Sequence, residues 1–210
     1  LCEVVSASAL AGQLAVIEWV LRDPFTSVCG KNFSAAVQGK HLGVVKCLYA
    51  AWSVQQTHDD AYLRTCLRYG SVATLEWMLS VGWALPETAV TIATSNPPVL
   101  TCLVARGHPV YPSALAAVAW KRSPSLVRWL IDVAKCPPDP SAAAMNAAAA
   151  HGDVDVLRAL ADHGCAIALG TAAERLPGER GTLWTAAHHG SLEAAKYLID
   201  VLRAPLEAQH

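Results

Sequence analysis

One pattern of apolar residues recurs seven times along the 210-residue sequence, and it constrains the fold more than any other feature. In the clearest copy, from Gly181 to Ile199 (GTLWTAAHHGSLEAAKYLI), Gly190 separates two short segments whose apolar positions lie three and four residues apart. This spacing is typical of amphipathic helices. The copy therefore predicts a helix, a tight turn at Gly190 and a second helix.

The same frame fits six other places, and we call the central residue of each copy its anchor. The anchors are Gly12, Lys40, Gly70, Ser95, Arg122, Gly152 and Gly190, at intervals of 28, 30, 25, 27, 30 and 38 residues. The residue eight after each anchor is apolar: Val20, Leu48, Met78, Leu103, Leu130, Leu160 and Leu198. The residue six after each anchor is polar or charged: Glu18, Lys46, Glu76, Thr101, Arg128, Arg158 and Lys196.

A single helix pair cannot cover its own apolar faces, so such pairs must stack on their neighbours. The sequence therefore predicts an all-α solenoid of about seven helix–turn–helix repeats, forming a single repeat domain over residues 1–210. Because the sequence opens on Leu1 inside a predicted helix, we expect it to be a piece of a longer chain.

Turn residues and prolines support this frame. Four of the seven anchors are glycine, which adopts the left-handed turn conformation most easily. Lys40, Ser95 and Arg122 suit such a turn less well, so we expect strained or differently shaped turns there. A helix tolerates proline in its first turn, and three prolines therefore predict helix starts: Pro86, Pro112 and Pro140.

The composition argues against several classes of structure and function. A chain with 53% hydrophobic and 16% charged residues is too apolar to be disordered. A net charge of −1 without a run of Lys or Arg argues against a nucleic-acid partner. No apolar stretch reaches the roughly 18 residues that cross a membrane, so we expect no membrane association. Seven widely spaced cysteines without Cys-x-x-Cys favour an intracellular, cytoplasmic location over a disulfide framework or zinc site.

No catalytic motif stands out in the sequence. It contains neither a phosphate-binding glycine loop nor a Gly-x-Ser-x-Gly nucleophile motif. The adjacent His188 and His189 point about 100° apart on a helix, which makes them poor joint ligands of one metal ion. Cys47 and Cys102 occupy a helix-packing position. We expect no enzymatic activity, no cofactor and no metal site.

Three segments resemble the ankyrin repeat family: GTLWTAAHHGSLEAAKYLI, AAMNAAAAHGDVDVLRAL and AAVQGKHLGVVKCL. The period is shorter than the family's roughly 33 residues. Loops such as SVGWALPE and ARGHPVYP are too brief for full β-hairpin fingers. The chain is therefore similar to a divergent branch of the family with reduced fingers. The long last interval contains ALGTAAERLPGERG, residues 168–181, which is either a finger or a loop without a function of its own.

The resemblance implies a monomeric, non-catalytic scaffold that binds another protein along the concave surface formed by the first helix of each repeat. Trp120 beside Lys121 and Arg122 is the first choice for a contact site, and the second is the group Arg64, Arg68 and Tyr69. The complete set of candidate residues on this surface is Arg64, Arg68, Tyr69, Trp120, Lys121, His151, Trp184 and His188. Two interpretations of the scaffold stay open, a substrate-recruiting adaptor and a purely structural spacer within a larger assembly.

Overall fold

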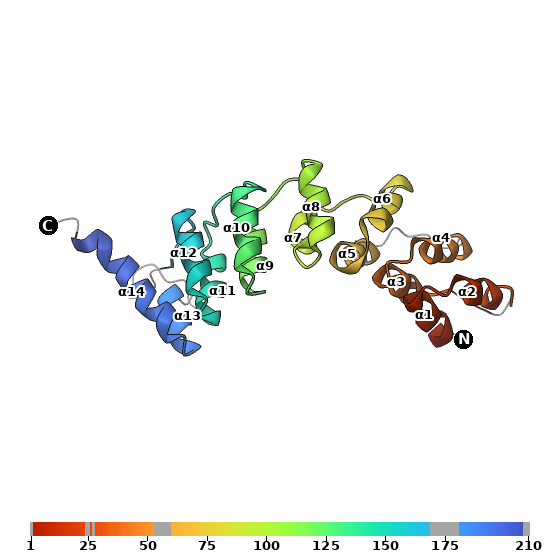
Figure 1. Cartoon of the computed structure of the whole chain (residues 1–210), viewed down its shortest axis with the longest axis horizontal. Helices are drawn as coiled ribbons and strands as arrows, with labels where there is room; N and C mark the ends of the chain where they lie inside the picture. The colour runs from red at the N-terminus through yellow and green to blue at the C-terminus, as the bar shows by residue number, and fades with distance from the viewer. Residues whose placement is uncertain (1, 24–25, 27, 53–59, 169–180, 208–210) are drawn as a thin grey trace. The chain divides into compact units, whose positions relative to one another are not determined.

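The computed structural model describes residues 2–23, 26, 28–52, 60–168 and 181–207, and within these ranges the chain forms fourteen helices and no strand (Figure 1). The helices divide into two compact units, Leu1–Pro109 and Val110–His210. A single domain over residues 1–210 stays a prediction, and each unit is considered by itself.

The first unit consists of four helix pairs in chain order. They are α1 (Cys2–Ala11) with α2 (Leu14–Val20), α3 (Gly30–Gln38) with α4 (Leu42–Ala51), α5 (Asp60–Tyr69) with α6 (Val72–Ser80), and α7 (Ala89–Ala93) with α8 (Pro97–Ala105). The first helix of each pair packs against the first helix of the next, and the second helices pack on one another in the same way. We call the first helix of each pair the inner helix and the second the outer helix.

The second unit repeats this arrangement with three pairs. They are α9 (Ser113–Ala119) with α10 (Pro124–Asp132), α11 (Ala143–His151) with α12 (Val154–Asp162), and α13 (Thr182–His188) with α14 (Leu192–Glu207). The inner helix α11 lies between α9 and α13, and the outer helix α12 lies between α10 and α14.

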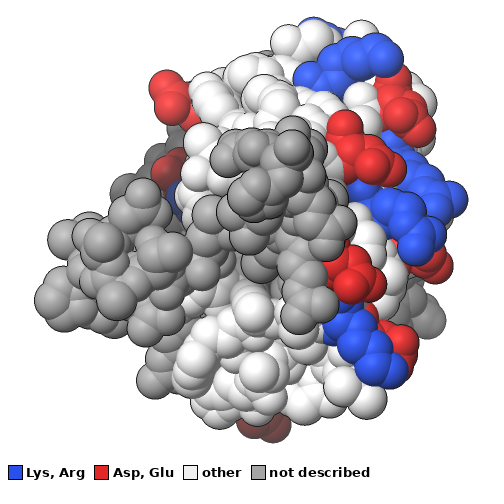
Figure 2. All heavy atoms as spheres, turned by 90° about the vertical axis from the view of Figure 1, so that its left-hand side faces the viewer, with Lys and Arg blue, Asp and Glu red and all other residues white. Residues whose placement is uncertain are grey.

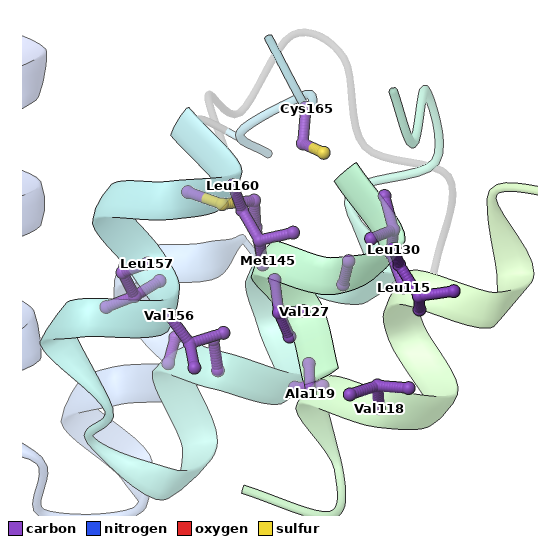
Figure 3. Packing of buried hydrophobic residues seen from close by; sticks show 14 of the residues in the cluster. Leu115, Val118, Ala119, Val127, Leu130, Met145, Val156, Leu157, Leu160 and Cys165 are labelled. Carbon is purple, nitrogen blue, oxygen red and sulfur yellow. The ribbon is translucent and has the colours of Figure 1, made fainter. Parts of the chain in front are cut away.

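The apolar columns of the sequence form the core. All seven residues eight after the anchors are buried, and all seven residues six after them are exposed. In the second unit, Leu115 and Met145 of the inner helices pack with Val127, Leu130 and Leu160 of the outer helices in one cluster (Figure 3). The predicted all-α repeat architecture is confirmed.

The turns between paired helices differ along the chain. Lys40 and Arg122 adopt left-handed conformations with φ of 63° and 54°, as Gly12, Gly152 and Gly190 do. Backbone strain at these two positions is therefore present as expected, because a side chain disfavours this region. Gly70 and Ser95 have no positive φ. In that part of the chain the buried Asn96 donates a 2.8 Å hydrogen bond from Nδ2 to the Gly70 carbonyl oxygen.

The predicted helix starts at proline are only partly correct. Pro112 directly precedes α9, as expected. Pro86 and Pro140, however, lie before the helices rather than in their first turns, since α7 begins at Ala89 and α11 at Ala143. Before α11 the left-handed Ala142, with φ of 58°, separates Pro140 from the helix. The prolines that do occupy first turns are on outer helices: Pro97, Pro98 and Pro124.

The long last interval falls mostly outside the description, because residues 169–180 lie beyond the described ranges. Its two ends are joined, since the Thr182 N–H donates to the Ala168 carbonyl oxygen at 2.9 Å. The buried Thr182 hydroxyl also donates to Oδ1 of Asn146 at 2.7 Å, which connects α13 to α11. Among the described helices, none combines the length and apolar character needed to cross a membrane.

Candidate interaction surface

The inner helices of the second unit differ from the outer helices in charge. Helices α9, α11 and α13 contain no Lys, Arg, Asp or Glu. The outer helices carry both signs close together, including the exposed ion pairs Arg158–Asp155 and Lys196–Glu193. Seen from the C-terminal end, basic and acidic side chains gather in a mixed band on one side of the surface (Figure 2). The inner helices therefore present an uncharged surface in this unit.

Exposed aromatic side chains mark this uncharged surface. Trp120, directly after α9, is 57% exposed, and its ring meets that of His151 edge to face at 5.1 Å. On α13, Trp184 and His188 form a second edge-to-face pair at 4.5 Å. We call these four residues the aromatic row. Its members lie at the end of α9, on α11 and on α13, and α11 packs against both of the other two helices.

The two histidines of the aromatic row differ in accessibility. His151, at the end of α11, is half-buried, and its Nε2 is enclosed without a hydrogen-bond partner. His151 therefore supports the Trp120 ring and is itself poorly placed to touch a partner. His188 is exposed and stacks on the exposed His189 at 5.3 Å. No group of three or more metal-ligating side chains occurs in the described ranges.

Lys121 lies next to the aromatic row, in the turn between α9 and α10. It is exposed, directly follows Trp120, and precedes the left-handed Arg122. The backbone N–H of Arg122 donates to the Ala119 carbonyl oxygen at 3.1 Å, which closes the tight turn between α9 and α10. This turn fixes the position of Trp120, so the indole stands on a short and constrained segment rather than on a long loop.

The other three candidates lie on α5 in the first unit. Arg68 and Tyr69 line a groove of about 480 Å³ at the ends of the inner helices. Its remaining lining residues are Leu10, Gln38, Lys40, Ser95, Asn96, Pro97 and Pro98. Arg64 is exposed one helical turn earlier and does not line this groove. Two basic side chains, Lys40 and Arg68, line the groove and no carboxylate does, so we call it the basic groove.

Of the nine residues that line the basic groove, the candidate set contains only Arg68 and Tyr69, and Leu10 and Lys40 are among those it missed. Leu10 is an apolar side chain 52% exposed at the end of α1, and Lys40 is the anchor of the second repeat. Lys40 could have been found from the sequence, because it is a basic residue at the anchor position, where four other repeats have glycine. Leu10 gave no signal, since an apolar residue in an amphipathic helix is ordinarily assigned to the core.

A hollow on the outer helices of the second unit is a weaker candidate. It measures about 380 Å³ and lies between Arg128, Asp132, Asp155, Arg158 and Asp162, with His163 at its end. Its opposite charges neighbour one another, and the Arg158–Asp155 pair is 3.9 Å apart on exposed side chains. Exposed pairs of this kind contribute little energy and select no particular ligand.

The geometry defines the class of protein: an all-α repeat protein built from paired inner and outer helices. Solved structures then identify the fold. The chain is similar to the ankyrin repeat domain of human ASB11, with 18% identity, a TM-score of 0.62, and coverage of 93% of this chain and 96% of that chain. It is also similar to the ankyrin repeat domain of Bcl-3, a member of the IkappaB protein family, with 16% identity, a TM-score of 0.54, and coverage of 92% and 96%. The chain has the ankyrin repeat fold. No protein-family model and no curated protein matches the sequence.

Proposed function

We propose that this chain is a non-catalytic scaffold inside the cell that binds another protein through its inner-helix surface. The observation that carries the proposal is the exposure of Trp120, directly after α9, and of Trp184 on α13, two inner helices without charged residues. An exposed indole leaves a large apolar area in water, and burying it against a partner is favourable. Tryptophan is enriched among the residues that dominate binding energy at protein interfaces.

The basic groove of the first unit supplies a complementary electrostatic element. Lys40 and Arg68 flank Tyr69 and the exposed Leu10, so the groove combines positive charge with apolar area. Such a groove suits a protein segment in which acidic side chains accompany an apolar residue. Charge complementarity of this kind accelerates encounter and selects between partners.

The fold of the solved ankyrin repeat domains supports a scaffold role in general. A substrate-recruiting adaptor is the specific form of scaffold that we favour, because an adaptor needs a rigid surface and no chemistry. A structural spacer would not need exposed tryptophan on its inner helices. The spacer interpretation predicts that replacing Trp120 has no effect on any interaction of the chain.

A pair of matched variants tests the proposal. Trp120→Ala removes the indole from the inner surface, and Trp19→Ala removes a still more exposed indole, at 70% against 57%, from the outer helix α2. Proteins that bind the immobilised chain in a lysate of its source are quantified for both variants. We expect the main bound protein to be lost with Trp120→Ala and retained with Trp19→Ala. Equal retention by both variants, or loss only with Trp19→Ala, contradicts the proposal.

A further inference from the structure

Two cysteines that are distant in the sequence meet in the first unit. Cys2 is the first residue of α1, and Cys29 directly precedes α3. Their Sγ atoms are 3.0 Å apart across 27 positions of sequence, and both residues are free thiols. This distance is shorter than the ordinary contact between two sulfur atoms. Cys2 is exposed and Cys29 half-buried, so small reagents reach the pair from solvent.

A buried asparagine fixes this arrangement. Asn32 is fully buried, and its Nδ2 donates to the Cys2 carbonyl oxygen and to the Ser6 hydroxyl, both at 2.9 Å. Its Oδ1 accepts a 2.8 Å hydrogen bond from the backbone N–H of Cys29. One side chain thus holds the backbone of both cysteines. The proximity of the two thiols is therefore part of the packing of α1 on α3.

The two thiols differ in acidity. Burial by itself would raise the pKa of Cys29, but hydrogen bonds from Cys2 and from the backbone N–H groups of Asn32 and Lys31 outweigh it and lower the pKa. The hydrogen bond with Cys29 raises the pKa of Cys2. Cys29 also stands at the N-terminus of α3, a position that stabilises a thiolate, so it is the better placed nucleophile of the pair and Cys2 the resolving thiol.

Three buried cysteines form a contrast within the same chain. Burial raises the pKa of the Cys66 thiol to about 12 and that of Cys136 to about 11. Cys165 is also buried, and burial raises its pKa. Buried thiols with raised pKa values react slowly with oxidants. These three residues therefore serve as internal references for the reactivity of Cys2 and Cys29.

We propose that Cys2 and Cys29 are a reversible disulfide-forming site that hydrogen peroxide oxidises. The Cys29 thiolate attacks one peroxide oxygen, the O–O bond breaks, and after proton uptake one water leaves as Cys29 becomes a sulfenic acid. The Cys2 sulfur, losing its proton, then attacks the Cys29 sulfur, the S–O bond breaks and a second water leaves. The two sulfurs together lose two electrons, which reduce the peroxide. A small dithiol reverses the reaction by thiol–disulfide exchange.

The position of this site gives the disulfide a structural effect. Both thiols line a hollow of about 790 Å³ with Tyr62, Lys31 and Gln38, and this hollow shares Leu10 and Gln38 with the basic groove. A bond between Cys2 and Cys29 would cross-link the start of α1 to the start of α3. The inference does not depend on the proposed function, since the oxidation requires no protein partner.

The test uses the whole chain and hydrogen peroxide. After exposure, free thiols are alkylated, and a protease digest is read by mass spectrometry. We expect a linked Cys2–Cys29 peptide to form at least about tenfold faster than any oxidised form of Cys66 or Cys136, and to disappear with dithiothreitol. A linked peptide that never forms, or one that forms no faster than oxidation of the buried thiols, overturns the proposal.

Two variants separate the roles of the thiols. With Cys2→Ser, Cys29 should accumulate as a sulfenic acid that reacts with dimedone. With Cys29→Ser, which places a good helix-capping residue before α3, neither the disulfide nor the dimedone adduct should form. Far-UV circular dichroism identical to that of the parent chain shows that each variant is folded. A dimedone adduct on Cys2 in the Cys29→Ser variant, at the rate of Cys29 in the Cys2→Ser variant, would reject the assigned roles.

Discussion

The buried carboxylate of Asp139 accepts a 2.8 Å hydrogen bond at Oδ2 from the backbone N–H of Ala144, in the first turn of α11. Its Oδ1 accepts two more, at 2.9 Å from the Ser141 backbone N–H and at 2.6 Å from the Ser141 hydroxyl. The backbone carbonyl oxygen of Asp139 accepts a 2.8 Å hydrogen bond from the backbone N–H of Ala166. Asp139 therefore caps the central inner helix of the second unit and connects it to the chain that follows α12.

Asp139→Asn is expected to destabilise the protein by about 1–2 kcal/mol near neutral pH, because an amide offers one acceptor oxygen where the carboxylate offers two. Burial alone would raise the pKa of Asp139, but the hydrogen bonds from Ser141, Ala144 and Ala143 outweigh it and lower the pKa. A carboxyl with a lowered folded-state pKa contributes stability above its unfolded-state pKa and loses that contribution as the pH falls through the folded-state value.

Urea unfolding of the parent chain and of Asp139→Asn, measured from neutral to acidic pH, checks this expectation. The difference in the free energy of unfolding should be largest near neutral pH and should shrink below the ordinary pKa of an aspartate. Exposed Asp155→Asn serves as the control, since its carboxylate makes only a 3.9 Å surface ion pair. A difference between parent and Asp139→Asn that stays constant down to acidic pH would refute this role of the carboxylate.

The left-handed anchors give a second prediction, on backbone conformation. Gly190 has φ of 70° and its surroundings leave room for a Cβ atom, so Gly190→Ala should destabilise only through the backbone, by roughly 1–2 kcal/mol. Arg122 has φ of 54° and already bears this strain, so Arg122→Gly should stabilise by up to about 1 kcal/mol. Thermal unfolding of the two variants measures both changes. A loss of stability in Arg122→Gly as large as in Gly190→Ala would show that Arg122 is not strained.

The basic groove gives a third prediction, on affinity. Arg68→Glu reverses a charge inside the groove, and Lys46→Glu makes the same change on the exposed face of the outer helix α4. For the partner bound by the parent chain, Arg68→Glu should weaken binding by about tenfold or more, or about 1.4 kcal/mol, whereas Lys46→Glu should change it far less. Isothermal titration calorimetry distinguishes the two. Equal effects of both variants would mean that net charge, and not the groove, governs binding.

The fold was predictable from the sequence because the same pattern of apolar and polar positions recurs in every repeat. The residues eight after the anchors are buried and the residues six after them are exposed throughout, since a helix that stacks on identical neighbours must present the same face each time. The starts of α7 and α11 were less predictable. At α11 the start depends on Asp139, whose hydrogen bonds to Ser141 and Ala144 belong to this copy alone.

The binding role of the candidate surface stays a prediction, whereas the exposure of its residues was predicted in part. Trp120, Lys121, Trp184 and His188 are exposed on the inner-helix side as expected, but the half-buried His151 supports Trp120 instead. This difference could not be read from the sequence, because accessibility at the end of α11 depends on the indole contributed by the neighbouring repeat. The contact between Cys2 and Cys29 was equally hidden, since the wide spacing of the cysteines argued against a disulfide framework or zinc site.

Our central proposal is that Trp120 and Trp184 contact the partner, and tryptophan oxidation reports on it directly. Hydroxyl-radical footprinting of the chain, alone and with the captured partner, compares labelling at Trp120, Trp184 and the outer-helix Trp19, all of them exposed in the free chain. The account predicts that the partner suppresses labelling of Trp120 and Trp184 and leaves Trp19 unchanged. Undiminished labelling of Trp120 and Trp184 in the complex would contradict it.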